Sequence, residues 1–390
     1  MPVTSQPADS NQYLYWIALK KVSGVGNLIF RRLVKRFGEP ECIVNASMKD
    51  LLSVDGMTPR IVRAMHGAIK GEAFSGDVRR EFDLIRRRGY RIITQTDEGY
   101  PRLLLEIHDP PPYLYANGCA FNLSPTIAIV GSRHPTSYGV SMARRLGADL
   151  AARGFIVASG MAAGIDTAAH KGALSAGGKT AAVLGSGLAV IYPPQNTKLY
   201  DHIVDSGVVL SELPPLEPPN AYNFPARNRI ISGMSLGTVV VEAAKKSGSL
   251  ITAMLAAEQG RDVFAVPGSI ESCKSIGAHS LLKQGAKLVE NVDDIIEEYS
   301  HLTGILEQGR VFSQSMGVSV GRNEKVVPMG LTQAESDVYY LLEPYPVHID
   351  DLARKAGIDS AGLSATLLKL ELMGKAVQMP GKYFISSGEK

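Results

Sequence analysis

The chain has 390 residues, more than a single hydrophobic core usually organises, so we expect two or three domains. Its formal net charge of +3 is too small to indicate a nucleic-acid-binding protein by itself, and no apolar run reaches the roughly 18 residues of a membrane span. The first residues lack the basic and apolar regions of a signal peptide, so we expect a cytoplasmic protein with no membrane contact. Cys42, Cys119 and Cys273 lack chelating spacing. We therefore expect reduced, buried thiols and no metal site.

Residues 1–78 are predicted to form a helical domain of the SAM or helix-hairpin-helix type. The segments VSGVG (22–26) and VDGM (54–57) each precede a helical pattern. A Gly-x-Gly turn exposes backbone amides to which a DNA phosphate can bind, so Gly24, Gly26 and Arg31 are candidates for a secondary phosphate contact. Residues 1–75 carry ten Lys or Arg against six Asp or Glu. Because the second turn lacks its second glycine, a spacer or protein-interaction role stays open.

Residues 79–300 are predicted to form an α/β domain with a Rossmann-like, doubly wound, mostly parallel sheet. Continuous apolar strands alternate there with amphipathic helices, which is typical of a parallel sheet covered on both faces. A bridging region at about 81–123 adds the short strands YRIIT and PYLYA, which we expect to abut this sheet. The parallel strands are expected at 126–130, 155–159, 180–184, 208–213, 238–243, 262–266 and 286–290. In such sheets ligands bind beyond the carboxyl ends of the strands.

A polar, Gly-rich linker is predicted at 301–328 and a winged-helix domain at 329–390. Three short helical patterns are followed by a hairpin pattern, KAVQ to KYF. Residues 329–386 carry five basic and seven acidic residues, and a phosphate-binding surface should not be acidic. We therefore favour a protein-contact or regulatory role for this domain.

The loop after the first parallel strand, GSRHPTSYG, has the composition of an anion site. Gly131 permits a tight turn, Ser132 and Thr136 offer hydroxyl donors, and the planar guanidinium of Arg133 suits a phosphate. A helix N-cap beside a surface arginine is the alternative. In the loop after the second strand, Asp166 is interpreted as a helix cap and His170 as a packed or surface histidine.

The stretch from Phe224 to Ala253 supplies two further strand-end loops rich in polar donors. The Phe224 ring is suited to stack under a base, with Arg227, Asn228 and Arg229 beside it. Arg229 is alternatively a buried ion-pair partner of Glu212 or Glu242. At the next helix N-terminus, charge and backbone donors come from Lys245, Lys246, Ser247, Gly248 and Ser249.

Several enzyme classes are disfavoured by the same loops. Val190 stands where a dinucleotide fingerprint needs its third glycine, and GGKT (177–180) has Ala173 where a P-loop needs glycine and precedes a strand. No Ser/His/Asp or Cys/His constellation emerges. We therefore predict no catalytic residue and no cofactor.

Taken together, GSRHPTSYG, SGMAAGIDTAAH, GSGLAVIYPPQN, SELPP, FPARNRIISGMS, VVEAAKKSGSLITA, AAEQGRDVFAVPG and GAHSLLKQGA resemble the DNA processing protein A (DprA/Smf) family over roughly residues 85–298. The resemblance implies a non-enzymatic protein that binds single-stranded DNA, protects incoming DNA and helps to load the RecA recombinase in natural transformation. It also implies homodimerisation through the Rossmann domain. The family's DNA contacts map onto Arg133, Phe224 and the 227–229 segment, whereas Pro194 replaces a lysine found in some members, which puts one phosphate contact in doubt.

Two other functions stay open. One is a nucleoside-monophosphate phosphoribohydrolase, because GTVVVE (237–242) resembles the G-T-x-x-E motif of that enzyme family. Here three residues separate the threonine from the glutamate, and no Pro-Gly-Gly precedes them. The other is a duplex-binding regulator acting through the winged helix, which its acidic balance disfavours.

Overall fold

The computed structural model describes residues 12–70, 73–119, 122–302, 332–342, 347–379 and 381–386. The chain divides into two compact units, the second comprising Val311–Lys390 with the short segment Thr136–Tyr138, and the first the remainder. The predicted linker lies outside the described residues from position 303 onward.

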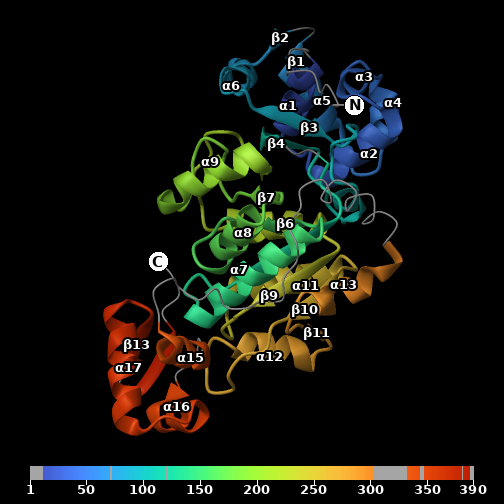
Figure 1. Cartoon of the computed structure of the whole chain (residues 1–390). Coiled ribbons are helices and arrows are strands. Elements are labelled where there is room, and N and C mark those ends of the chain that lie inside the picture. Colours follow the sequence, from blue (N-terminus) through green and yellow to red (C-terminus); the bar gives the residue numbers. More distant parts are fainter. Residues whose placement is uncertain are drawn as a thin grey trace. The chain divides into compact units, whose positions relative to one another are not determined.

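The first unit is built on one nine-stranded sheet (Figure 1). Its strands are β3 (Arg91–Thr94), β4 (Tyr113–Gly118), β5 (Thr126–Gly131), β6 (Ile156–Ser159), β7 (Thr180–Val183), β8 (Val208–Ser211), β9 (Gly237–Val241), β10 (Asp262–Ala265) and β11 (Lys287–Leu288). They lie in the order β11-β10-β9-β5-β6-β7-β8-β4-β3. All neighbours from β11 to β8 pair in parallel, and β4 and β3 extend the sheet antiparallel at one edge.

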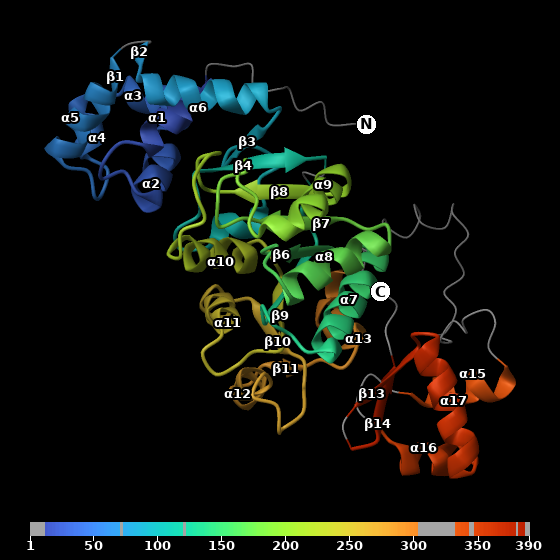
Figure 2. The same cartoon turned by 90° about the vertical axis from the view of Figure 1, so that its left-hand side faces the viewer.

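Helices cover both faces of this sheet. They are α7 (Ser137–Ala152), α8 (Ile165–Ser175), α9 (Thr197–Ser206), α10 (Asn223–Gly233), α11 (Gly248–Glu258), α12 (Ile276–Lys283) and α13 (Asp293–Ile296), with 3-10 turns η1 (Arg102–Glu106), η2 (Pro194–Asn196) and η3 (Glu297–Leu302). Figure 2 shows α10, α11 and α12 on one side of the sheet and α7, α8 and α9 on the other. The predicted Rossmann-like, doubly wound sheet with its bridging edge strands is confirmed.

The strands form where the sequence is apolar on both faces. Every residue of β6, β7, β8 and β9 is buried, including the hydroxyl residues Ser159, Thr180, Ser211 and Thr238. Near-continuous burial is what a parallel sheet covered by two helical layers requires. β8 ends at Ser211, two residues earlier than predicted, because the Glu212 side chain turns into a polar network described below.

The N-terminal helices are α1 (Gln12–Lys20), α2 (Asn27–Phe37), α3 (Pro40–Val44), α4 (Met48–Leu52), α5 (Pro59–Ala68) and α6 (Gly76–Arg87). Two short strands, β1 (Ile69–Lys70) and β2 (Ala73–Phe74), pair antiparallel between α5 and α6. Trp16 stacks on Phe30 at the centre of this layer, with ring centroids 5.3 Å apart. Its core is continuous with buried residues of β3 and β4, among them Ile92 and Tyr115. α6 runs through the predicted domain boundary at 78/79, so the helical layer and the sheet share one hydrophobic core.

The second unit has the predicted winged-helix arrangement. Its described elements are α15 (Gln333–Leu341), β12 (Val347–His348), α16 (Ile349–Ala356), α17 (Ser360–Leu372), β13 (Ala376–Met379) and β14 (Tyr383–Ser386), with the strands in the order β12-β14-β13. Thr332 and Glu335 form a capping box at the start of α15. A separate apolar cluster that includes Leu352, Leu363, Leu367 and Phe384 forms its core.

Two further features concern the cysteines and the length of the helices. The three cysteines are free, as expected, but the expectation that they are buried is wrong, because each side chain lies on an outer surface. None of the helices in the described ranges is long and apolar enough to cross a membrane.

Candidate nucleic-acid interface

The candidate site lies at the point where the strand order reverses, between β5 and β9. From β5 the chain continues to β6, β7 and β8 on one side and returns to β9, β10 and β11 on the other. The loops after β5 and β9 are joined by a hydrogen bond from the Ser132 amide to the Glu242 carbonyl (2.8 Å). The Ser132 carbonyl in turn accepts the Ile165 amide of α8 (3.1 Å). Ligands of doubly wound sheets bind at such reversal points, so the topology brings the predicted GSR loop to the favoured place.

The loop after β9 has an unusual backbone. Glu242 adopts a left-handed conformation, with φ of 54°, although it is not a glycine. Its carboxyl group is buried against Gly139 in the first turn of α7, where an added Cβ would lie 2.6 Å from the Glu242 Cδ atom. A carboxylate at a helix N-terminus is stabilised by the helix dipole. The Glu242 carboxyl group therefore already occupies the space beside Gly139 in the first turn of α7.

An exposed arginine and two aromatic rings meet beside the GSR loop, and we call Arg133, Tyr192 and Phe224 the aromatic–arginine cluster. The Arg133 Cζ atom lies 5.1 Å from the centroid of the Phe224 ring, within the range of a cation–π contact. The Phe224 and Tyr192 centroids are 5.9 Å apart, with their planes tilted by 45°. Gly185 makes room for the Phe224 ring, since an added Cβ would lie 2.7 Å from its Cδ1 atom.

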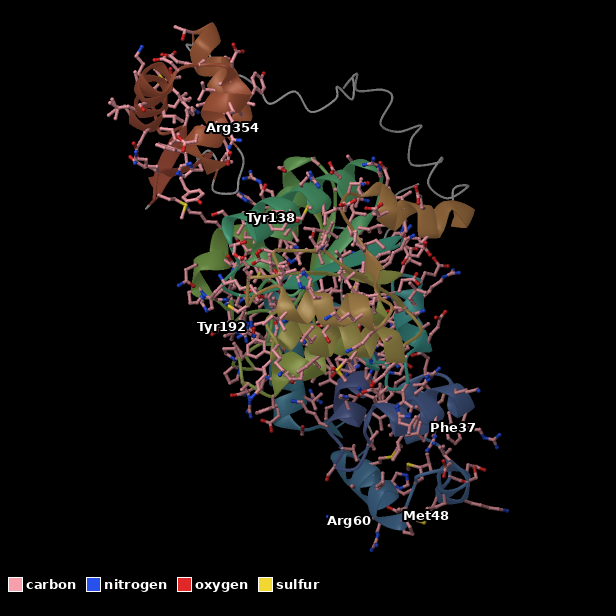
Figure 3. All side chains as sticks on the ribbon, turned by 90° about the horizontal axis from the view of Figure 1, so that it is seen from below. Phe37, Met48, Arg60, Tyr138, Tyr192 and Arg354 are labelled. Atoms are coloured by element: carbon pink, nitrogen blue, oxygen red, sulfur yellow. The ribbon has the colours of Figure 1, made fainter. Side chains whose placement is uncertain are left out.

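Tyr192 did not emerge from the sequence as a site residue. The residue is 44% exposed, and Figure 3 shows it at the surface of the first unit. The sequence shows only a tyrosine in a polar, Pro-rich loop after a buried strand. Its contact with Phe224, which lies thirty-two positions later in the chain, is visible only in the fold. The cluster is thus assembled from three separate strand-end segments.

The expectation that Arg227 lies in a strand-end loop is wrong. It belongs to α10 and is only 6% exposed. Its Nη1 atom donates to the Gly160 carbonyl (2.7 Å) and to the Val183 carbonyl at the end of β7. Burial lowers the pKa of Arg227 to about 10, an effect that the neighbouring Asp166 opposes, so the guanidinium stays charged at neutral pH. Arg227 therefore fixes the ends of two strands from inside the protein.

Asp166 is the buried counter-ion in this interior. Its carboxylate accepts the amides of Gly160 (3.2 Å) and Ala162 (3.3 Å), so it holds the loop after β6. The helix cap position belongs to Gly164, which corrects the interpretation of Asp166 as a simple cap. Burial raises the pKa of Asp166, and Arg227 and the two amides oppose this rise.

His170 is packed in the core, which was one of the two interpretations of this residue. Its Nδ1 atom lies 2.6 Å from the Thr180 hydroxyl. Burial lowers the pKa of His170 to about 3, with a further contribution from Arg227, so the imidazole is neutral at physiological pH. His170 is therefore a core residue and not a member of the candidate site.

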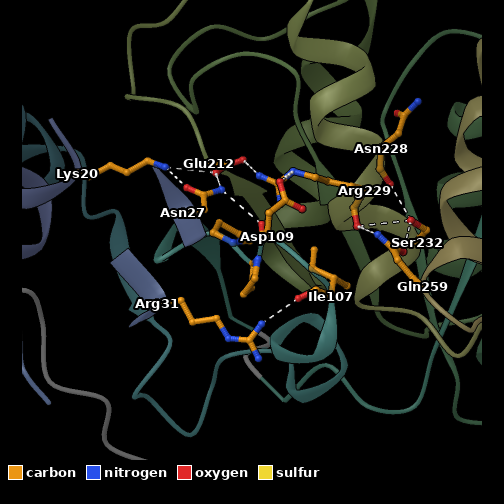
Figure 4. A network of polar contacts seen from close by, with 12 residues as sticks. Lys20, Asn27, Arg31, Ile107, Asp109, Glu212, Asn228, Arg229, Ser232 and Gln259 are labelled. Carbon is orange, nitrogen blue, oxygen red and sulfur yellow. Dashed lines mark hydrogen bonds and ion pairs between the residues drawn. The ribbon is translucent and has the colours of Figure 1, made fainter. Parts of the chain in front are cut away.

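Arg229 takes the structural alternative that the sequence left open. It forms ion pairs with Glu212 at the end of β8 and with Asp109, 3.3 Å from Nε to the carboxylate, and donates to the Asp109 carbonyl at 2.8 Å (Figure 4). Its side chain is 12% exposed. On the other side of α10, the Arg229 carbonyl accepts the Gln259 amide (3.0 Å) of the segment after α11. Arg229 therefore anchors α10 within the fold.

The Glu212 carboxylate also contacts residues of the N-terminal helices. Glu212 accepts the side-chain amide of Asn27 at the start of α2 (2.9 Å) and lies 3.7 Å from the Lys20 Nζ atom. Arg31 of α2 donates to the Ile107 carbonyl at 3.1 Å (Figure 4). The three residues predicted as a secondary phosphate contact have different environments. Gly24 and Gly26 are exposed, whereas Arg31 is hydrogen-bonded to the sheet domain through Ile107.

The segment after β9 presents its charges outward. Lys245 and Lys246 are exposed. Ser247 is the N-cap of α11 and accepts the Ser249 amide (3.4 Å), while Gly248 faces open space. Asn228 is half-buried, and its side-chain oxygen accepts the Arg227 Nε–H at 3.1 Å. The predicted residues therefore fall into two groups. Arg133, Lys245 and Lys246 are exposed, whereas Arg227 and Arg229 are largely buried and hold α10 in the fold.

The carboxylates nearest the strand ends are all engaged in structural contacts, as described for Asp166, Glu212 and Glu242. In the described part of the chain, His, Cys, Asp and Glu side chains form no group that could hold a metal ion. A cavity of about 290 Å³ lies between the helical layer and the sheet edge, next to the end of β8, and its lining includes Glu212, Leu213 and Pro214. Its lining includes the ion pairs Lys21–Glu81 (2.8 Å) and Lys20–Glu212, so its charges are already compensated.

Comparison with known proteins agrees with this architecture. The family model of DNA recombination-mediator protein A matches residues 91–300, and that of the DprA winged helix domain matches residues 324–382. Protein Smf of Synechocystis sp. is 32% identical over 394 residues, covering 95% of this chain and 98% of that protein. The DNA processing protein DprA of Streptococcus pneumoniae is 47% identical over 204 residues, covering 52% of this chain and 72% of that protein.

Two solved structures are similar to the chain. The X-ray structure of DNA processing protein A from Streptococcus pneumoniae superposes with a TM-score of 0.63 at 36% identity, covering 73% of this chain and 97% of that chain. A structure describing the single-stranded DNA binding mode of DNA processing protein A from Helicobacter pylori has a TM-score of 0.50 at 30% identity, covering 54% and 96% respectively.

Proposed function

The chain belongs to the DNA recombination-mediator protein A family, and from this premise we propose that it is a cytoplasmic protein that binds single-stranded DNA. The observation that carries the proposal is the aromatic–arginine cluster at the reversal point of the sheet. Grooves that hold single strands combine basic groups for the phosphates with aromatic rings for the bases. Both kinds of group are present here on one surface.

The proposed contacts follow the exposure of each residue. Arg133 and the adjacent donors Gly131, Ser132 and Thr136 would bind phosphate, with Phe224 beneath the arginine. Lys245, Lys246 and the Ser247–Ser249 turn would extend the positive surface along the strand. Arg227, Asn228 and Arg229 would act mainly by holding α10 in place. The exposed turn at Gly24 and Gly26 would form a secondary phosphate contact. Arg31 would join it only after releasing the Ile107 carbonyl, to which it donates.

Fluorescence anisotropy with labelled oligonucleotides tests this function. Wild-type protein should bind an oligothymidylate much more tightly than a blunt duplex, and its affinity should fall as salt rises. Arg133→Ala should weaken single-strand binding without unfolding the protein, since Arg133 is exposed.

The matched control is Arg153→Ala, which removes an exposed arginine just beyond the other end of α7, where it pairs with Asp293. This variant should bind like wild type. Equal wild-type affinity for single strands and blunt duplex would reject the proposal.

We propose that the protein acts without catalysis. The support is that the three strand-end carboxylates make structural contacts, which leaves none poised as a general acid or base in the aromatic–arginine cluster. Incubation with nucleoside monophosphates should release no ribose phosphate. Release that is abolished by Glu242→Ala would instead favour the phosphoribohydrolase alternative.

We further propose that the protein protects incoming single-stranded DNA and helps to load the RecA recombinase in natural transformation. The support is the family's description as a recombination mediator. RecA filament formation on single strands coated with single-strand-binding protein should be faster when the protein is added, and Arg133→Ala should reduce this gain. No gain at saturating protein would reject the mediator role.

A homodimer formed through the Rossmann domain is the last part of the proposal. Its support is a set of exposed apolar side chains on α11, α12, the loop between β10 and α12, and the edge strand β11, namely Ile251, Met254, Ile270, Ile276 and Leu288. Large apolar side chains that stay exposed on one domain can mark a protein interface. Sedimentation should give a dimer that Met254→Glu with Ile276→Glu converts to a monomer. Leu216→Glu, at another exposed leucine, should not do so.

A further inference from the structure

The aromatic surface of the cluster is divided unequally between its two rings. Phe224 is half-buried, with the Arg133 guanidinium over its ring and the backbone of Gly185 close to its edge. A base approaching from the Arg133 side would have to displace a favourable cation–π contact. Among the described residues no guanidinium covers the Tyr192 ring, and the residue is 44% exposed. The open aromatic surface therefore belongs to Tyr192.

The loop that carries Tyr192 is held firmly at several points. The Gly187 amide donates to the Glu217 carbonyl (2.9 Å), the Ala189 amide to the Pro215 carbonyl (2.9 Å), and the Ser186 hydroxyl to the Val190 carbonyl (2.7 Å). Just beyond the tyrosine, Asn196 donates to the Met161 carbonyl at 2.8 Å. A ring on an anchored loop loses little conformational freedom on binding, which favours its use as a rigid platform.

We propose that Tyr192 stacks on a base of the bound strand, whereas Phe224 is a positioning residue that holds the Arg133 guanidinium for a neighbouring phosphate. This assignment rests on the proposed single-strand binding and adds a division of labour within it. Tyrosine stacking is tolerant of base identity, because every base offers a π face. The site would accordingly select for unpaired bases rather than for sequence.

The first test separates base contacts from phosphate contacts. Affinity is measured for an oligothymidylate of about 16 nucleotides and for an abasic strand of equal length, which keeps the phosphates and lacks the bases. Wild type should prefer the thymidylate. Tyr192→Ala should weaken thymidylate binding at least about fivefold and leave abasic binding unchanged, in line with the usual strength of one stacked base. Arg133→Ala and Phe224→Leu should weaken binding to both strands.

The second test uses fluorescence. Trp16 is the only tryptophan of the chain and is 1% exposed in the helical layer, so its emission gives a constant background. Tyr192→Trp should keep thymidylate binding, and its added emission should be quenched by the thymidylate but not by the abasic strand. Tyr222→Trp provides the comparison, because Tyr222 is 71% exposed next to α10 but has no ring contact with Phe224.

The outcomes distinguish this proposal from the proposed function. If wild type binds neither strand, single-strand binding itself is rejected, and the stacking assignment is rejected with it. If wild type binds thymidylate but Tyr192→Ala binds it equally well, only the stacking assignment is overturned. Quenching of Tyr222→Trp without quenching of Tyr192→Trp would likewise overturn it and transfer the stacking role to Tyr222.

Discussion

At the scale of single residues, two arginines close to Phe224 have opposite environments and should respond oppositely to mutation. Arg133 is exposed, whereas Arg227 is buried and donates to the carbonyls that end β6 and β7. Removing one partner of a buried charge pair leaves the other uncompensated. The identity of the residue is the same, but the structural role is set by burial.

Arg227→Ala should therefore lower the free energy of unfolding by roughly 3 kcal/mol, because it leaves Asp166 without its counter-ion and removes the hydrogen bonds to the Gly160 and Val183 carbonyls. Urea unfolding measures this change. Arg133→Ala should change the unfolding free energy by less than about 0.5 kcal/mol, as is usual for exposed positions. Equal stability of the two variants would contradict the assignment of Arg227 to the interior.

The buried imidazole of His170 should make the free energy of unfolding depend on pH. Burial lowers its folded-state pKa to about 3, so the folded state favours the neutral ring, and the resulting stability is present above the unfolded pKa of about 6.5. It is lost as the pH falls from about 6.5 toward 3. Between pH 7 and pH 4.5 the loss should be on the order of 2 kcal/mol.

The His170 contribution is isolated by comparing wild type with His170→Gln in urea at both pH values. Asp166 titrates in the same core with a raised pKa, so its contribution has the opposite sign, and only the difference between the two proteins is diagnostic. The stability of His170→Gln should fall less on acidification. An identical fall in both proteins would show that His170 is not the acid-sensitive group.

The sequence predicted the position of those candidate residues whose placement depends on local features. Arg133 follows a glycine at a strand end, and the rule for parallel sheets places it correctly beside the reversal point. The burial of Arg227 could not be predicted in this way, because it depends on Gly160, whose lack of a side chain lets the guanidinium reach two strand ends sixty-seven and forty-four positions away. Tyr192 was missed for the same reason, since its partner Phe224 is remote in sequence.

At the scale of elements, α10 is the junction of the molecule. Its first residues carry Phe224 and Arg227, and its middle carries Arg229, which pairs with Glu212 and Asp109. The sequence suggested a loop at the start of this stretch. Pro225 was compatible with that interpretation, but it lies in the first turn of the helix, where a missing amide costs nothing. The strands, in contrast, were predicted to within about two residues because their burial leaves a continuous apolar pattern.

Glu212→Gln tests this junction. The carboxylate, 16% exposed, balances Arg229 and Lys20 and accepts Asn27, so its neutralisation should lower the unfolding free energy by roughly 3 kcal/mol. Because Arg229 anchors α10, single-strand affinity should also fall. The control is Glu106→Gln, whose 61% exposed carboxylate pairs with Arg261 and should cost less than about 1 kcal/mol. If both variants were equally stable, Glu212 would not be the anchor we describe.

At the scale of the whole molecule, continuity of the core distinguishes the two ends of the chain. The N-terminal helices share one apolar cluster with β3, β4 and residues of the parallel sheet, including Ala182 and Val209. The winged helix has its own core, with members such as Val338 and Leu370. The sequence predicted both flanking regions. Only the packing shows that the N-terminal helices share their core with the sheet, whereas the winged helix has a core of its own.

A chain that ends after Leu302 should therefore stay folded and keep single-strand binding to within about twofold, because the winged helix has an independent core and an acidic balance that does not favour phosphate. A chain that begins after the helical layer should unfold, because Tyr113 and Tyr115 would lose the helices that cover them. Urea unfolding and anisotropy with an oligothymidylate measure both properties. A large loss of affinity in the shortened but folded chain would assign the winged helix to DNA and reverse our interpretation of its charge.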